Sequence, residues 1–165
     1  MNATEAYKLG RETTKKADQI LNFTRTGEVL VITTAGTAYY KNQTTEDALE
    51  GILNQARGIV SYGKGNLLML RKTRLDPLDF AFIVRKGNDL ILAYFKNASM
   101  TPIYIGTVSQ NMTLTQYQAL QKKLGNDTFP IASLANAWAI GLSADILREA
   151  AFHGHVCMGT ISGYE

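Results

Sequence analysis

Both histidines and the only cysteine of this chain stand within five residues of one another, at His153, His155 and Cys157. Imidazole nitrogen and thiolate sulfur are preferred ligands of zinc and of related transition metals. Gly154 and Gly159 flank the two later residues and permit the positive φ angles that a tight ligand turn often needs. The pattern H-x-H-x-C therefore predicts a metal site with these three side chains as candidate ligands.

A purely structural arrangement also explains these residues, as two surface imidazoles and a small buried thiol where a helix gives way to a turn. A cysteine nucleophile activated by His153 or His155 is a further alternative. The chain has no cysteine-protease signature, no G-x-S-x-G elbow and no C-x-x-C-H haem motif. We therefore assign no catalytic residues and no residues that bind an organic cofactor.

The segment from Trp138 to Tyr164 resembles the FmdE-like family, whose members are related to one component of formylmethanofuran dehydrogenase. The signature of that family is a helix followed by F-H-G-H-x-C-P-G and a glycine-containing continuation, and Phe152 here begins the run F-H-G-H-V-C-M-G. A looser similarity, to N-terminal regions of family members from methanogenic archaea, covers residues 29–51. Met158 stands where the family has proline, so the turn after the cysteine is less rigid.

The resemblance implies an α+β domain with a metal site, usually taken to be zinc, and a link to one-carbon metabolism or metal handling in anaerobes. It implies that Cys157 is the thiolate ligand, and that His153 and His155 either bind the metal or support its ligands. The dehydrogenase activity itself belongs to other components of that complex, with other cofactors. We therefore expect this chain not to be catalytic on its own.

A closed structural zinc site has four ligands, and the motif supplies three at most. The fourth is expected from an earlier Asp or Glu, from a second chain in a homodimer that shares the site, from water, or from sequence beyond Glu165. In the family the motif opens a domain that continues well past this point. We therefore expect an α+β domain over residues 1–142, followed by the truncated start of a metal-motif segment over residues 143–165.

Three functions are consistent with these residues. The first, which we prefer, is a metal-binding domain that holds zinc or a similar ion. The second is a non-enzymatic extracellular ligand-binding or structural module whose motif has lost its metal. The third is a metal-dependent enzyme, in which an open coordination position activates water.

The asparagines carry a separate signal, because six of the ten begin an N-x-[ST] triplet, more than chance predicts. This triplet is the acceptor for N-glycosylation in secreted proteins. The six positions are Asn2, Asn22, Asn42, Asn97, Asn111 and Asn126. We expect an extracellular or cell-surface glycoprotein, with a cytoplasmic protein and accidental triplets as the alternative. The first residues lack the features of a signal peptide, so an exported protein would begin here at a mature or engineered start.

Composition excludes several classes of protein. A hydrophobic content of 45% excludes disorder, a single cysteine excludes a disulfide scaffold, and no apolar run approaches the length of a membrane span. The net charge of +3 comes from scattered basic pairs without an aromatic-basic module, so we expect no nucleic-acid partner. Asp76, Asp79, Asp89 and Asp127 show no spacing that indicates acid–base chemistry.

Hydrophobic periodicity predicts the elements that position the motif. Amphipathic patterns predict helices over residues 4–21, 44–57, 113–124 and 144–152, and β-branched or apolar runs predict strands over 28–34, 66–71, 80–85, 89–95 and 102–108. Gly87-Asn88 is a hairpin signal. The uncharged segment 129–140 fits a buried helix or a strand equally well. The expected fold class is α+β, with a mixed or antiparallel central sheet flanked by several amphipathic helices.

Overall fold

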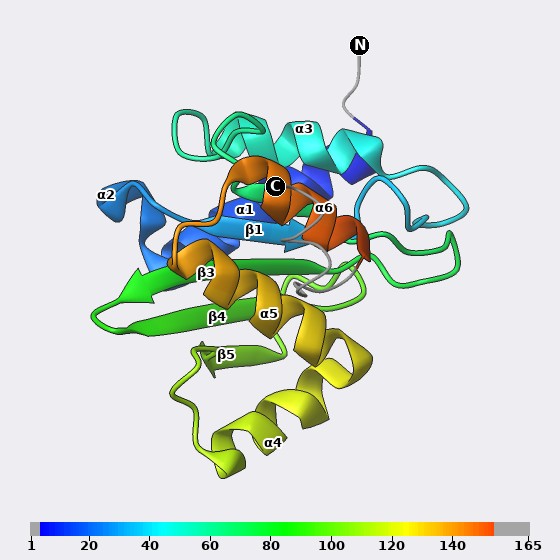
Figure 1. The fold of residues 1–165 in the computed structure, drawn as a ribbon. Helices are drawn as coiled ribbons and strands as arrows, with labels where there is room; N and C mark the ends of the chain where they lie inside the picture. The colour runs from blue at the N-terminus through cyan, green and yellow to red at the C-terminus, as the bar shows by residue number, and fades with distance from the viewer. Residues whose placement is uncertain (1–3, 154–165) are drawn as a thin grey trace.

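The computed structural model of the chain describes residues 4–153, and it places one five-stranded sheet between two layers of helices (Figure 1). The strands are β1 (Leu30–Thr33), β2 (Leu67–Met69), β3 (Phe80–Lys86), β4 (Asp89–Phe95) and β5 (Tyr104–Thr107). They lie side by side in the order β2-β1-β3-β4-β5. The predicted α+β class and the mixed sheet are confirmed.

The sheet is antiparallel except at β1 and β2, which run parallel and are joined by the crossover helix α3 (Glu46–Gln55). All four residues of β1 are buried, because this strand lies inside the sheet and is covered on both faces. The predicted hairpin joins β3 to β4, and Gly87 supplies the positive φ of 64° that a two-residue turn needs.

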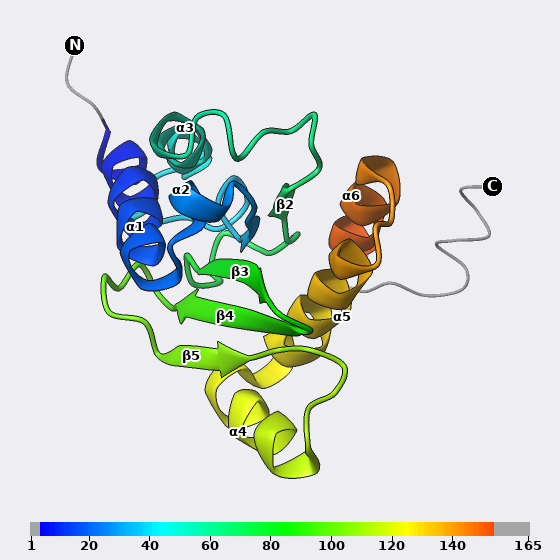
Figure 2. The ribbon, with the colours of Figure 1, turned by 90° about the vertical axis from the view of Figure 1, so that its left-hand side faces the viewer.

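One face of the sheet is covered by α1 (Glu5–Leu21) and α3, with the short α2 (Phe23–Thr26) beside them (Figure 2). The Thr4 hydroxyl caps α1 by accepting the Tyr7 N–H. The two long helices approach closely at glycines. A Cβ on Gly10 would lie 2.1 Å from the Ala48 carbonyl oxygen, and one on Gly51 would lie 2.2 Å from that of Tyr7.

The other face carries α4 (Leu114–Leu124), the 3-10 turn η1 (Gly125–Asp127), α5 (Thr128–Ala139) and α6 (Ala144–His153). Thr113 and Gln116 form a capping box at the start of α4, as expected for its predicted N-terminus. The undecided segment 129–140 is helical. Pro130 fits there because it occupies the first turn, where backbone N–H groups have no partner within the helix.

The last helix belongs to the same core, since Leu147, Ala150 and Ala151 of α6 are buried against the sheet layer. Among the residues that the structure describes, no helix combines the length and the apolar character that crossing a bilayer requires.

Candidate functional site

The helix that precedes the H-x-H-x-C motif is α6, and it ends at His153, the first candidate metal ligand. The other two candidates, His155 and Cys157, lie outside the described residues. Within residues 4–153, no three His, Cys, Asp or Glu side chains gather into a group that could hold a metal. The described part of the site is therefore helix α6, which ends at His153, together with the residues that contact this helix.

Contacts at both ends hold α6 in place. Gly65 lies against its first residue, so closely that a Cβ there would be 2.5 Å from the Ala144 Cβ. Arg148 Nη1 donates to the Tyr62 carbonyl oxygen at 2.8 Å. At the last turn, the Arg71 guanidinium lies 4.8 Å from the centre of the Phe152 ring. The end of α6 is thus attached to the segment that leaves β2.

One carboxylate of α6 stands at a favourable spacing from His153. Glu149 precedes this histidine by four residues, and positions at that spacing share one face of a helix. Glu149 is half-buried, and the described residues give it no hydrogen bond or ion pair. It is the acidic residue of α6 that stands nearest to His153 in the chain.

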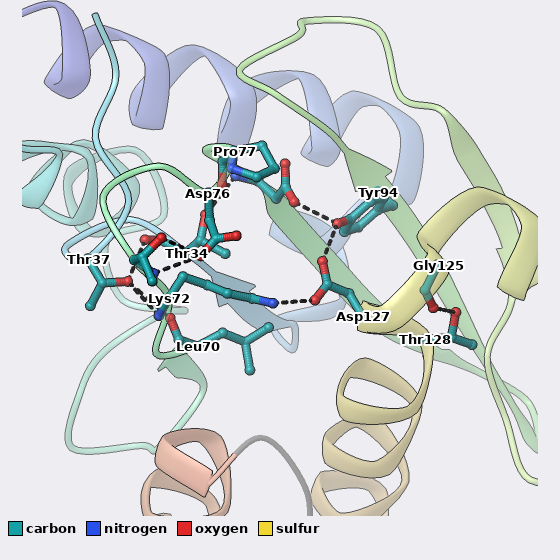
Figure 3. A network of polar contacts seen from close by, with 12 residues as sticks. Thr34, Thr37, Leu70, Lys72, Asp76, Pro77, Tyr94, Gly125, Asp127 and Thr128 are labelled. Carbon is teal, nitrogen blue, oxygen red and sulfur yellow. Dashed lines mark hydrogen bonds and ion pairs between the residues drawn. The ribbon is translucent and has the colours of Figure 1, made fainter. Parts of the chain in front are cut away.

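A second group of polar side chains lies where η1 meets the sheet (Figure 3). Lys72 Nζ donates to Asp127 Oδ1 at 2.7 Å. The Tyr94 hydroxyl donates to Asp79 Oδ2 at 2.8 Å, and its oxygen lies 3.5 Å from Asp127 Oδ2. One hydroxyl proton thus faces two carboxylates, and a lysine neutralises the second of them.

Burial controls the protonation of this network. Burial raises the pKa of Asp79, although the Asn97 N–H and the Tyr94 hydroxyl donate to its carboxylate and oppose the rise. Burial and the charges of Asp79 and Asp127 raise the pKa of Tyr94 far above its ordinary value. Burial lowers the pKa of Lys72, but the hydrogen bond and charge of Asp127 outweigh it, so this pKa is raised. At neutral pH the tyrosine is neutral and the lysine is charged.

Three members of the network, Lys72, Asp79 and Asp127, line a polar cavity of about 220 Å³. Asp76 also lines the cavity, and the Thr73 N–H, which donates to its carboxylate at 2.7 Å, holds its pKa below the usual value. Lys96 and Thr34 line it as well. The Tyr94 hydroxyl proton can be shared between the two carboxylates, and among the described residues no group of three or more His, Cys, Asp or Glu side chains here could hold a metal.

Three of the four aspartates that show no informative spacing in the sequence, Asp76, Asp79 and Asp127, meet at this cavity. One part of the arrangement has a signal in the sequence. The hairpin turn fixes the register that pairs Ala81 with Tyr94, and Asp79, two residues earlier, then lies diagonally opposite the tyrosine on the same face. Nothing in the sequence indicates that Lys72 and Asp127 meet.

Comparisons with family models, with characterised proteins and with solved structures found no match for this chain.

Proposed function

We propose that this chain is a metal-binding domain of the FmdE-like type that holds zinc or a related transition metal through Cys157, His153 and His155. The observation that carries the proposal is the placement of His153 at the end of a helix packed into the core, four residues after a carboxylate without a partner among the described residues. We propose that this carboxylate, Glu149, completes the donor set.

The chemistry of these donors supports a metal. One thiolate, two imidazoles and one carboxylate are ligand types that zinc accepts in a tetrahedral site. The Glu149 carboxylate has no hydrogen-bond donor among the described residues, so it is available to a bound cation. The role that we propose is in metal handling or one-carbon metabolism, without catalysis by this chain on its own.

We further propose that the protein is exported and glycosylated. The structure describes five of the six triplet asparagines, and all five are exposed and outside the α-helices and strands: Asn22, Asn42, Asn97, Asn111 and Asn126. Three of them, Asn22, Asn42 and Asn97, have positive φ, a conformation that asparagine tolerates well. This conformation gives a reason for asparagine, but it gives none for the Ser or Thr two residues later. Mass spectrometry of protein from its native source should find glycan on at least one site.

The metal proposal is tested by zinc titration of the metal-free chain against a competing chromophoric chelator. Cys157→Ser and His153→Ala should each weaken zinc binding at least tenfold, and Glu149→Gln should weaken it about tenfold. Loss of a residue that only supports a metal ligand already costs about ten- to a hundredfold in affinity. Glu12→Gln, an exposed change on α1, is the matched control and should have no effect. Equal zinc affinity in wild type and Cys157→Ser would contradict the proposal.

A further inference from the structure

A pocket of about 550 Å³ opens where the parallel strands β1 and β2 end, and α3 and α6 form its sides. Its lining comes from the loop after β1 (Gly36, Thr37), the first turn of α3 (Glu46), the end of β2 and the segment after it (Met69, Arg71) and the last turn of α6 (Phe152). Open sheets with parallel strands bind ligands outside the carboxyl ends of those strands. The volume lies in the range of small-molecule pockets.

Apolar side chains form most of this pocket, and several remain accessible. Tyr62, Met69 and Phe152 are 41%, 42% and 55% exposed, although large apolar side chains are usually covered. Gly36 keeps one wall open. A Cβ at this position would lie 3.2 Å from the Met69 sulfur, and its φ of +94° disfavours any larger residue.

The charged side chains that line the pocket differ in whether they are free to bind a ligand. The guanidinium of Arg148 is already used, because it donates to the Tyr62 carbonyl oxygen and to Asp145. Arg71 stacks on Phe152, and the described residues supply no carboxylate or carbonyl to its N–H groups. Glu46 contributes one negative charge, so the three charged side chains of the lining sum to +1.

We infer that this pocket binds a small amphipathic anion, with a planar apolar body and one carboxylate group. The apolar body lies against Met69, Tyr62 and Phe152, where burial of its surface drives binding. The carboxylate accepts hydrogen bonds from the Arg71 guanidinium, whose fork of N–H groups matches a carboxylate in a bidentate pair. This inference does not rest on the proposed metal, because every residue that carries it lies within residues 36–152.

Two matched probes test the inference, 2-naphthoate and its neutral analogue 2-naphthamide, titrated into the ¹⁵N-labelled full chain in EDTA. The naphthoate should bind at least tenfold more tightly, because its carboxylate accepts charge-assisted hydrogen bonds from Arg71 that the neutral amide does not form. Its amide shift changes should centre on Gly36, Thr37 and Met69. The EDTA separates this result from that of the metal proposal.

Three variants test whether Arg71 is the residue that recognises the carboxylate. Arg71→Gln should remove the preference for naphthoate while leaving the affinity for naphthamide unchanged, and this second value shows that the pocket is still folded. Arg25→Gln, an exposed change on α2, should change neither affinity. Glu46→Gln should tighten naphthoate binding, because it removes a like charge. Equal affinity for both probes, shift changes centred away from this pocket, or no binding at millimolar concentration would each overturn the inference.

Discussion

Lys72 and Asp127 form an ion pair of 2.7 Å that joins the segment after β2 to the turn between α4 and α5. Their side chains are only 28% and 13% exposed, so water screens the pair weakly. The same carboxylate faces the Tyr94 hydroxyl at 3.5 Å. The ion pair thus links the helices of one layer to the sheet beside the polar cavity.

Lys72→Met should destabilise the fold by about 2 kcal/mol, because it leaves Asp127 partly buried near Asp79 without its cation. Breaking a fully buried pair costs about 3–5 kcal/mol, and the partial exposure here reduces that value. Urea unfolding measures the change. Lys41→Met is the matched control, since Lys41 pairs with Glu5 on the open surface and its loss should change stability little. Equal effects of the two substitutions would show that burial of the first pair has no energetic consequence.

Tyr94→Phe should cost about 1–3 kcal/mol at pH 7 and less at pH 4. Burial raises the pKa of Asp79 in the folded protein. Its ionisation therefore lowers the stability of the fold as the pH rises above the ordinary pKa of an aspartate. The tyrosine donates to the ionised carboxylate, and removing it therefore raises that pKa further. Urea unfolding at both pH values measures the difference.

The control for this pH dependence is Tyr104→Phe. The Tyr104 hydroxyl donates to the Thr107 carbonyl oxygen at 2.8 Å, which does not titrate. Its loss should cost the same at pH 4 and pH 7. A pH-independent effect of Tyr94→Phe as well would contradict the proposed coupling to Asp79.

Thr13→Val and Thr14→Val should change stability in opposite directions. Both threonines are buried in α1. Among the described residues, the Thr13 hydroxyl has no hydrogen-bond partner, whereas that of Thr14 donates to the Gly10 carbonyl oxygen at 2.7 Å. Valine at position 13 removes an unsatisfied polar group and should stabilise by about 1 kcal/mol, and at position 14 it should destabilise by about 1 kcal/mol. Thermal unfolding of the two variants measures the sign of each change, and destabilisation by Thr13→Val contradicts the prediction.

Most elements are predictable where local signals agree. The β3–β4 hairpin follows from two apolar runs around Gly87-Asn88, and α4 follows from its capping residues and from Gly125. The segment 129–140 is not decidable from the sequence, because it carries no charge to mark an exposed face. The helix in this segment, α5, buries Ile131 and Trp138, whereas Ile140, directly after its end, is 71% exposed, a pattern that only the packed neighbours explain.

Tertiary contacts also override one local signal. The sequence T-T-E-D indicates a capping box near residue 44, but α3 begins at Glu46 without a side-chain cap. The Thr45 hydroxyl instead donates to the Ala38 carbonyl oxygen and accepts the Gly36 N–H. The loop after β1 thus uses the hydroxyl that a cap requires, and this loop lines the apolar pocket.

The candidate sites also differ in how far local sequence patterns predict them. The spacing of His153, His155 and Cys157 is visible in the sequence, as is the helix before them. The meeting of Lys72 with Asp127 depends on where η1 lies relative to the segment that follows β2, and residues 55 positions apart carry no local pattern for it. The Asp79–Tyr94 contact is partly predictable, because the register of the β3–β4 hairpin fixes it once the turn is known.

Elemental analysis tests the proposed metal site most directly. The full chain is purified without a metal-affinity column, beside a Cys157→Ser control, and its metal content is measured by plasma mass spectrometry. We predict about one zinc or related ion per chain in the wild type and a large loss in the variant. Equal metal content in both proteins, or none in the wild type after reconstitution with zinc, would contradict the proposal.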